Sequence, residues 1–186
     1  MNTNLKPYVK ILDLIQQWTD RHGPDCLDID NMPETKALRE YDAHELTLAM
    51  STILTYAELD TRMQAIDVLP YIVPCDVMID LLIPCLSDPS PDIRWTACES
   101  FHGNPDPRAV LPLVRVLEKD KDPDVRLVAA EALSSVGDER ALPALDYAVE
   151  HDKGKDYEDR TIANAAQEAI AEIGKRLSTH LASDSY

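Results

Sequence analysis

A motif that recurs every 32 residues constrains the fold of this chain more than any other feature of its sequence. The tripeptide Asp-x-Arg occurs with its aspartate at Asp60, Asp92 and Asp124 and its arginine at Arg62, Arg94 and Arg126. Each arginine is followed by an alanine after three residues, an acid after five and a large apolar residue after seven. These columns are Ala65, Ala97 and Ala129; Asp67, Glu99 and Glu131; and Leu69, Phe101 and Leu133. A fixed period of this length predicts stacked copies of one supersecondary unit, because a single copy cannot bury its own apolar face.

Each copy has the pattern of two helices joined by a short loop. In the third copy, apolar residues recur at helical spacing over residues 110–117 and again over 125–133. The second helices have clear starts, since Ser90 and Asp122 each offer a capping oxygen, followed by a proline and then by an acid in the first turn. At the helix ends, we expect Gly103, Gly137 and Gly174 to form left-handed C-caps. The pattern predicts an all-α fold.

The two ends of the chain depart from the strict repeat. A looser fourth copy aligns residues 168–174 with 131–137 at an offset of 37, whereas the Asp159-Arg160 pair lies 34 residues after the preceding Asp-Val-Arg arginine. The extra length falls in a charged loop at 151–156. Towards the N-terminus we expect a helix over about 5–20, a loop over 22–33 and a helix over about 43–57.

These elements predict an α-α superhelix of about four helix pairs. It would comprise an N-terminal capping helix and loop over 1–40, the repeats over 41–177 and a flexible tail over 178–186.

Composition narrows the classes of partner. The chain has 34 acidic and 18 basic residues, and its net charge is −16. Proteins that bind nucleic acid or anionic lipid normally carry an excess of Lys and Arg, so the charge disfavours both kinds of partner. The chain has no run of about 20 apolar residues and no secretory signal pattern, and its four cysteines form no C-x-x-C pair. We therefore expect a cytoplasmic protein without a metal or cofactor.

The segment from Asp122 to Leu145 reads D-P-D-V-R-x-x-A-A-x-A-L-x-x-x-G-D-x-x-A-L-P-x-L, and it resembles the HEAT repeats of the phycobilin-lyase-like class. The resemblance covers about residues 43–177. It implies a HEAT-like α-solenoid in which the Asp and Arg columns support a ladder between repeats and the second helices line a concave surface. It also implies a link to bilins, because some members of the class attach or detach these chromophores.

The acid column shares a helix face with side chains that suit protein binding. Positions i, i+4 and i+7 lie on one face, so Trp95, Glu99 and His102 line up on one helix. The positions 32 residues before and after Trp95 and Glu99 carry the same kinds of side chain. The expected binding residues are therefore Met63, Asp67, Trp95, Glu99, His102, Leu127 and Glu131. On the implied concave surface they would form an apolar row beside an acidic row, which Glu168 would extend. We interpret this strip as a binding site for a basic and partly apolar partner segment, centred on Trp95; a solvated helix face is the alternative interpretation.

A second charge asymmetry also favours a basic partner. Between Glu40 and Asp92 the chain has ten acids and a single base, Arg62.

Taken together, the residues predict a non-catalytic scaffold or adaptor that binds a protein partner through an acidic concave surface. Two alternatives stay open: a subunit of a bilin lyase or related chromophore-handling protein, and an immunity or inhibitor protein against a basic toxin. Enzymatic chemistry is disfavoured because the chain has no P-loop, G-x-S-x-G or G-x-G-x-x-G motif. The His44-Glu45 pair resembles the His-Glu pairs of the HEAT-repeat di-iron hydroxylases. Those enzymes need several such pairs around their metals, and this sequence has one. The sequence makes no prediction of oligomeric state.

Overall fold

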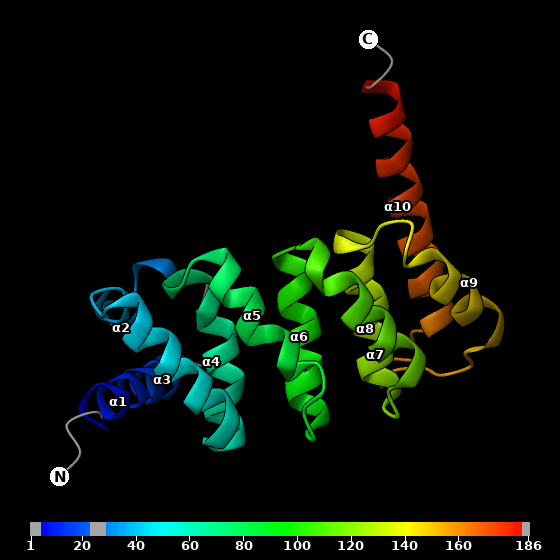
Figure 1. Ribbon diagram of the computed structural model, residues 1–186. Coiled ribbons are helices and arrows are strands. Elements are labelled where there is room, and N and C mark those ends of the chain that lie inside the picture. Colours follow the sequence, from blue (N-terminus) through cyan, green and yellow to red (C-terminus); the bar gives the residue numbers. More distant parts are fainter. Residues whose placement is uncertain (1–4, 23–28, 184–186) are drawn as a thin grey trace. The chain divides into compact units, whose positions relative to one another are not determined.

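The computed structural model describes residues 5–22 and 29–183, which form α-helices and short 3-10 helices joined by loops (Figure 1). The chain divides into two compact units, Met1–Leu82 and Ile83–Tyr186. The predicted all-α fold of helix pairs is confirmed. None of the helices in the described ranges combines the length and the apolar character needed to cross a membrane.

The first unit is built around its N-terminal helix. It contains α1 (Leu5–His22), the 3-10 helix η1 (Ile29–Asn31), α2 (Pro33–Leu38), α3 (Ala43–Tyr56), α4 (Leu59–Ile72) and most of α5 (Cys75–Cys85). Helix α1 packs against α2, α3 and α4, and it buries Ile11 and Ile15. The helices expected at about 5–20 and 43–57 are therefore present. Part of the loop expected over 22–33 lies outside the described residues, at 23–28, and its end forms η1 and the start of α2.

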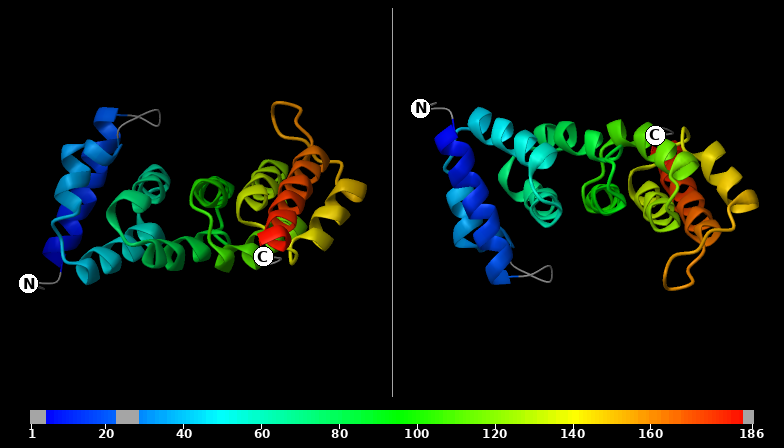
Figure 2. Two further views of the ribbon diagram at one scale, coloured as in Figure 1. Left: turned by 90° about the horizontal axis from the view of Figure 1, so that it is seen from above. Right: turned by 90° about the horizontal axis from the view of Figure 1, so that it is seen from below.

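The second unit has two layers of helices. It contains the end of α5, α6 (Pro91–Gly103), the 3-10 helix η2 (Pro107–Ala109), α7 (Val110–Lys119), α8 (Pro123–Val136), α9 (Leu142–His151) and α10 (Ile162–Ser183). The second helices of successive pairs lie side by side, with α8 between α6 and α10, while the first helices α7 and α9 contact each other (Figure 2). Residues 178–183, expected in the tail, continue α10, and 184–186 lie outside the described residues.

Small side chains fill the contacts between these helices. Ala97, Ala129 and Ala132 are completely buried, as is Phe101, the only phenylalanine of the chain. Alanine lets helix backbones approach closely, so Leu, Val, Ile and Ala fill the interior with little need for aromatic rings. The aromatic content of 5% follows from this packing.

The two predicted N-caps differ in the structure. The Asp122 side chain accepts a hydrogen bond from the Asp124 N–H at 2.9 Å and so caps α8 as predicted. Ser90 makes no such bond to the backbone of α6, and its hydroxyl instead donates to the Asp92 carboxylate at 3.2 Å. The Ser90 N–H donates to the Asp88 carboxylate at 2.9 Å, so an aspartate two residues earlier organises this turn.

The prediction of left-handed caps at three glycines is wrong. None of Gly103, Gly137 and Gly174 has a φ in the left-handed region, and Gly174 lies inside α10. Gly137 is extended, with φ −62° and ψ 149°. A Cβ at Gly137 would lie 2.4 Å from the Leu133 carbonyl oxygen and 2.8 Å from Cδ1 of Ile173 on α10. The missing side chain therefore allows α10 to pack against the end of α8.

We predict that Gly137→Ala lowers the free energy of unfolding by about 1–3 kcal/mol, because the new methyl group must displace both the Leu133 carbonyl and Ile173. Gly174→Ala is the matched control, since a Cβ there meets nothing within 4 Å. It should raise the free energy of unfolding by about 0.5–1 kcal/mol through helix propensity. Urea denaturation followed by circular dichroism measures both values, and a Gly137→Ala protein as stable as the wild type would contradict the close-contact explanation.

Candidate functional site

An arginine–aspartate pair connects the third repeat to the one before it. The Arg94 guanidinium binds both carboxylate oxygens of Asp120, at 2.6 and 2.8 Å. The same guanidinium donates to the backbone carbonyl of Asp88 at 2.8 Å, and the Asp120 carboxylate also accepts from the Asp122 N–H at 3.0 Å. Arg94 therefore joins the loop before its own helix to the loop that follows α7.

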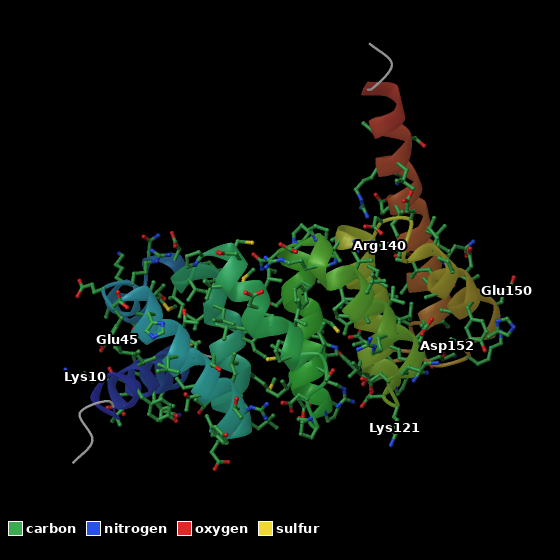
Figure 3. The ribbon with its side chains drawn as sticks, viewed as in Figure 1. Lys10, Glu45, Lys121, Arg140, Glu150 and Asp152 are labelled. Atoms are coloured by element: carbon green, nitrogen blue, oxygen red, sulfur yellow. The ribbon has the colours of Figure 1, made fainter. Side chains whose placement is uncertain are left out.

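The same arrangement recurs one repeat later. Arg126 binds both carboxylate oxygens of Asp152, at 2.7 and 3.1 Å, and donates to the Asp120 backbone carbonyl at 3.0 Å. The Asp152 carboxylate accepts from the Gly154 N–H at 2.8 Å. Figure 3 labels Asp152 at the end of the unit where Lys121 also lies, opposite the end that carries Arg140. The two pairs form a ladder along one edge of the second unit.

The ladder uses an acidic column that the sequence analysis missed. Asp88, Asp120 and Asp152 recur at the 32-residue period, and this spacing was the available signal. The predicted structural aspartates do not pair with the arginines in the described contacts of this unit: Asp92 and Asp124 lie in the first turns of α6 and α8. In the first unit, Asp60 lies in the first turn of α4, and the Arg62 guanidinium donates to the Leu54 carbonyl at 2.6 Å.

Hydrogen bonding lowers the pKa of the ladder carboxylates. Burial by itself would raise the pKa of Asp120, but the hydrogen bonds from Arg94 and from the Asp122 N–H outweigh it and hold the pKa below its usual value. Burial would also raise the pKa of Asp152. The hydrogen bonds from Arg126 and from the Gly154 N–H outweigh burial and lower this pKa. Both aspartates are therefore ionised near neutral pH.

The second helices bring three glutamates to one groove. We call it the acidic groove; it has a volume of about 260 Å³ and is lined by Glu99, His102, Glu131, Ser134, Ala165 and Glu168. Glu99 comes from α6, Glu131 from α8 and Glu168 from α10. Burial raises the pKa of Glu131, and the negative charge of Glu99 adds to this, against the opposing attraction of Arg160.

Hydrogen bonds position the polar side chains of this groove. His102 Nδ1 lies 3.0 Å from the Glu131 backbone carbonyl oxygen and 3.2 Å from the Ser135 hydroxyl. Because a carbonyl can only accept, Nδ1 carries the proton in the first of these contacts. His102 thereby bridges α6 to α8 at the groove.

A structured loop places an arginine against the acidic groove. The Arg160 guanidinium contacts Glu131 Oε1 at 2.7 Å and Asp156 Oδ2 at 2.7 Å. The buried Asp156 also accepts from the backbone N–H groups of Glu158 and Arg160, at 2.9 and 2.8 Å. Asp159 completes the turn with a φ of 63°. Arg160, which the sequence alignment placed near the Arg column, therefore binds the acid column instead.

The predicted binding residues are only partly brought together. Glu99, His102 and Glu131 line one groove, and Trp95, four residues before Glu99 on α6, is 39% exposed. Leu127 is only 2% exposed, so its assignment to an exposed apolar row is wrong: α8 is covered by neighbours on several sides. Met63 and Asp67 lie on α4, in the first unit; Met63 is half-buried and Asp67 is exposed.

A metal site is not found in the described ranges, where His, Cys, Asp and Glu form no group of three or more that could hold an ion.

Comparisons with known proteins identify the repeat. The family described as HEAT repeats matches residues 79–171. Among solved structures, the chain is similar to the crystal structure of an engineered protein from a structural genomics consortium, with a TM-score of 0.51 and 18% identity. That similarity covers 93% of this chain and 80% of the engineered protein, and it concerns the fold alone. Comparison with curated proteins found no match.

We predict that Asp120→Asn lowers the free energy of unfolding at pH 7 by roughly 1–3 kcal/mol, because Arg94 loses its charged acceptor. The folded pKa of Asp120 lies below the unfolded value of about 3.9, so the carboxylate stabilises the fold above that pH. This stabilisation is lost as the pH falls through the lower, folded pKa. The difference between wild type and variant should therefore shrink in urea denaturation below about pH 4.

The control for this experiment is Asp146→Asn, which removes an exposed carboxylate from α9 and should change stability by less than about 0.5 kcal/mol. A difference between wild type and Asp120→Asn that stays constant from neutral to strongly acidic pH would contradict the role given to the Arg94–Asp120 pair.

Proposed function

Because this chain belongs to the HEAT-repeat family, we propose that it is a non-catalytic scaffold whose acidic groove binds a basic segment of a partner protein. HEAT repeats generally mediate protein–protein interaction. The observation that carries the proposal is the convergence of Glu99, Glu131 and Glu168, from three successive second helices, on one groove. Carboxylates in such a cluster favour the ammonium of lysine or the guanidinium of arginine, with which they form charge-assisted hydrogen bonds.

The contact made by Arg160 supports a cationic ligand group. Its half-exposed guanidinium already lies against Glu131, at 2.7 Å. Glu99 and Glu168 are exposed and form no hydrogen bond or ion pair with the described residues. The groove therefore presents one carboxylate that is engaged and two that are open to a partner.

The exposed indole of Trp95 supports a partner segment that is partly apolar. Trp95 lies one helical turn before Glu99, and tryptophan is enriched among residues that dominate binding energy. A segment with basic and apolar side chains would match this combination. The proposal is confined to the second unit, so it does not use Met63, Asp67 or the buried Leu127.

We predict that Glu99→Gln/Glu168→Gln weakens the binding of a fluorescein-labelled peptide of alternating lysine and leucine by about tenfold. The expected cause is the loss of two unengaged carboxylates. Fluorescence anisotropy measures the affinity, which for the wild type should also fall as salt rises, because salt screens exposed charges.

The matched control is Glu139→Gln/Glu150→Gln, which removes the same charge from exposed positions outside the acidic groove. If both double variants lose affinity equally, the peptide senses only net charge, and the acidic groove is not the binding site.

We also predict that Arg160→Gln tightens the binding of the same lysine peptide several-fold, because the variant removes a cation that competes for Glu131. Arg140→Gln is the control, since Arg140 pairs with Asp138 at the other end of the unit. Weaker binding by Arg160→Gln, with an unchanged circular dichroism spectrum, would show that Arg160 organises the groove and does not compete for it.

Purification from the native cell tests the class of partner. A bound protein with a basic segment that high salt releases is the expected result. A chromophore absorbance in the purified protein would instead favour the bilin-handling alternative, and a bound basic toxin would favour the immunity alternative.

A further inference from the structure

Three unpaired cations gather at one place in the second unit. In its described part, only Arg115, Lys119 and Lys121 among the lysine and arginine side chains form no hydrogen bond or ion pair. Arg115 and Lys119 belong to α7, and Lys121 lies in the loop that follows it (Figure 3). All three are exposed. Such a concentration is unexpected in a chain whose net charge is −16.

These side chains line a groove of about 480 Å³, which we call the basic groove. Its apolar wall includes Ile83, Leu86 and Val116, from α5, the turn after it and α7. The Arg94–Asp120 pair also lines it, together with Asp88, so four cations face two carboxylates. The lining is net positive and partly apolar.

The repeat architecture does not require these cations. The positions 32 residues later carry Tyr147, His151 and Lys153. There the Tyr147 ring stacks on His151, with centroids 4.3 Å apart, and the Lys153 ammonium donates to the Glu150 carbonyl at 3.1 Å. In the corresponding groove, which has a volume of about 260 Å³, this aromatic pair stands where the other groove has Arg115 and Lys119. The ladder is the same in both grooves, so the three free cations are a property of one repeat.

We propose that the basic groove binds an acidic peptide segment of a protein partner, one that carries carboxylates beside at least one apolar side chain. The free cations of Arg115, Lys119 and Lys121 would bind the carboxylates, and the half-buried Ile83 on the wall would contact the apolar side chain. This surface is distinct from the acidic groove, which α6, α8 and α10 form. The inference therefore goes beyond the proposed function and does not depend on it.

A peptide fits this surface better than a nucleic acid does. Duplex DNA carries one negative charge per about 1.7 Å of its axis, so it would extend past the three cations onto the surface of a chain whose net charge is −16. A short acidic segment places its few charges only at the three cations. The lining of the groove also has no aromatic ring on which a base could stack.

The test uses fluorescence anisotropy with a labelled peptide of alternating glutamate and leucine, and with a second peptide in which glycine replaces leucine. The full-length wild type should bind the leucine peptide and bind the glycine peptide less tightly. Arg115→Gln/Lys119→Gln/Lys121→Gln should bind the leucine peptide at least about tenfold less tightly. Lys10→Gln/Lys36→Gln/Lys175→Gln changes the net charge equally at exposed positions outside the groove and should bind it within about twofold of the wild type.

Each other outcome overturns the proposal. Absence of binding by the wild type, or equal losses in both triple variants, removes the basic groove as a peptide site. If both peptides bind equally and inorganic phosphate displaces them, the cations form a simple anion site. If a thymidine oligonucleotide binds more tightly than the leucine peptide and needs the same three cations, the ligand is a nucleic acid. An unchanged circular dichroism spectrum shows that the groove variant is folded. Binding of the lysine–leucine peptide is measured separately, so failure here is distinguishable from failure of the acidic groove.

Discussion

Two arginine–aspartate pairs, one repeat apart, hold the loops of the second unit in register. Arg94 and Arg126 each bind a carboxylate of the next repeat through two donors and a carbonyl of their own loop through a third. The paired side chains of Arg94 and Asp120 are only 15% and 6% exposed. In such surroundings an ion pair is weakly screened, and losing one partner leaves an uncompensated charge. Each pair therefore favours one spacing between neighbouring repeats.

The register set by these pairs decides which side chains of successive repeats lie next to one another on the layer of second helices. When successive loops are held alike, residues at the same position in each copy face the same way, which brings Glu99 and Glu131 together. Glu168 joins them although its offset is 37 residues, because the loop before α10 absorbs the added length. Close packing of α10 on α8 also needs Gly137, beside which Ile173 lies. The acidic groove thus depends on a ladder and a glycine that do not belong to it.

The net charge of −16 conceals local surfaces of opposite sign. The acidic groove collects glutamates from three helices, while the basic groove collects the cations of Arg115, Lys119 and Lys121. At physiological ionic strength, charge interactions at the surface are largely screened beyond about 8 Å. A partner segment in contact with either groove therefore responds mainly to the local side chains.

The periodic pattern of the sequence by itself determined the helix pairs, the buried alanine columns and the Arg column of the ladder. It also determined that Glu99 and Glu131 are equivalent, because helical spacing and a 32-residue period are local properties of the chain. It did not determine which face of a helix its neighbours cover. Leu127 and Trp95 occupy equivalent positions, yet Leu127 is buried because α8 packs against α6, α7 and α10, whereas Trp95 is 39% exposed.

Only the tertiary structure decided the contacts between residues that are far apart in sequence. It paired Arg94 with Asp120 and Arg160 with Glu131, and it gave Gly137 a role in close packing where a left-handed turn was expected. Distances of this kind depend on how whole helices approach one another. A periodic pattern records the apolar face of each helix, but the approach of two helices is decided by the packing of all their side chains together.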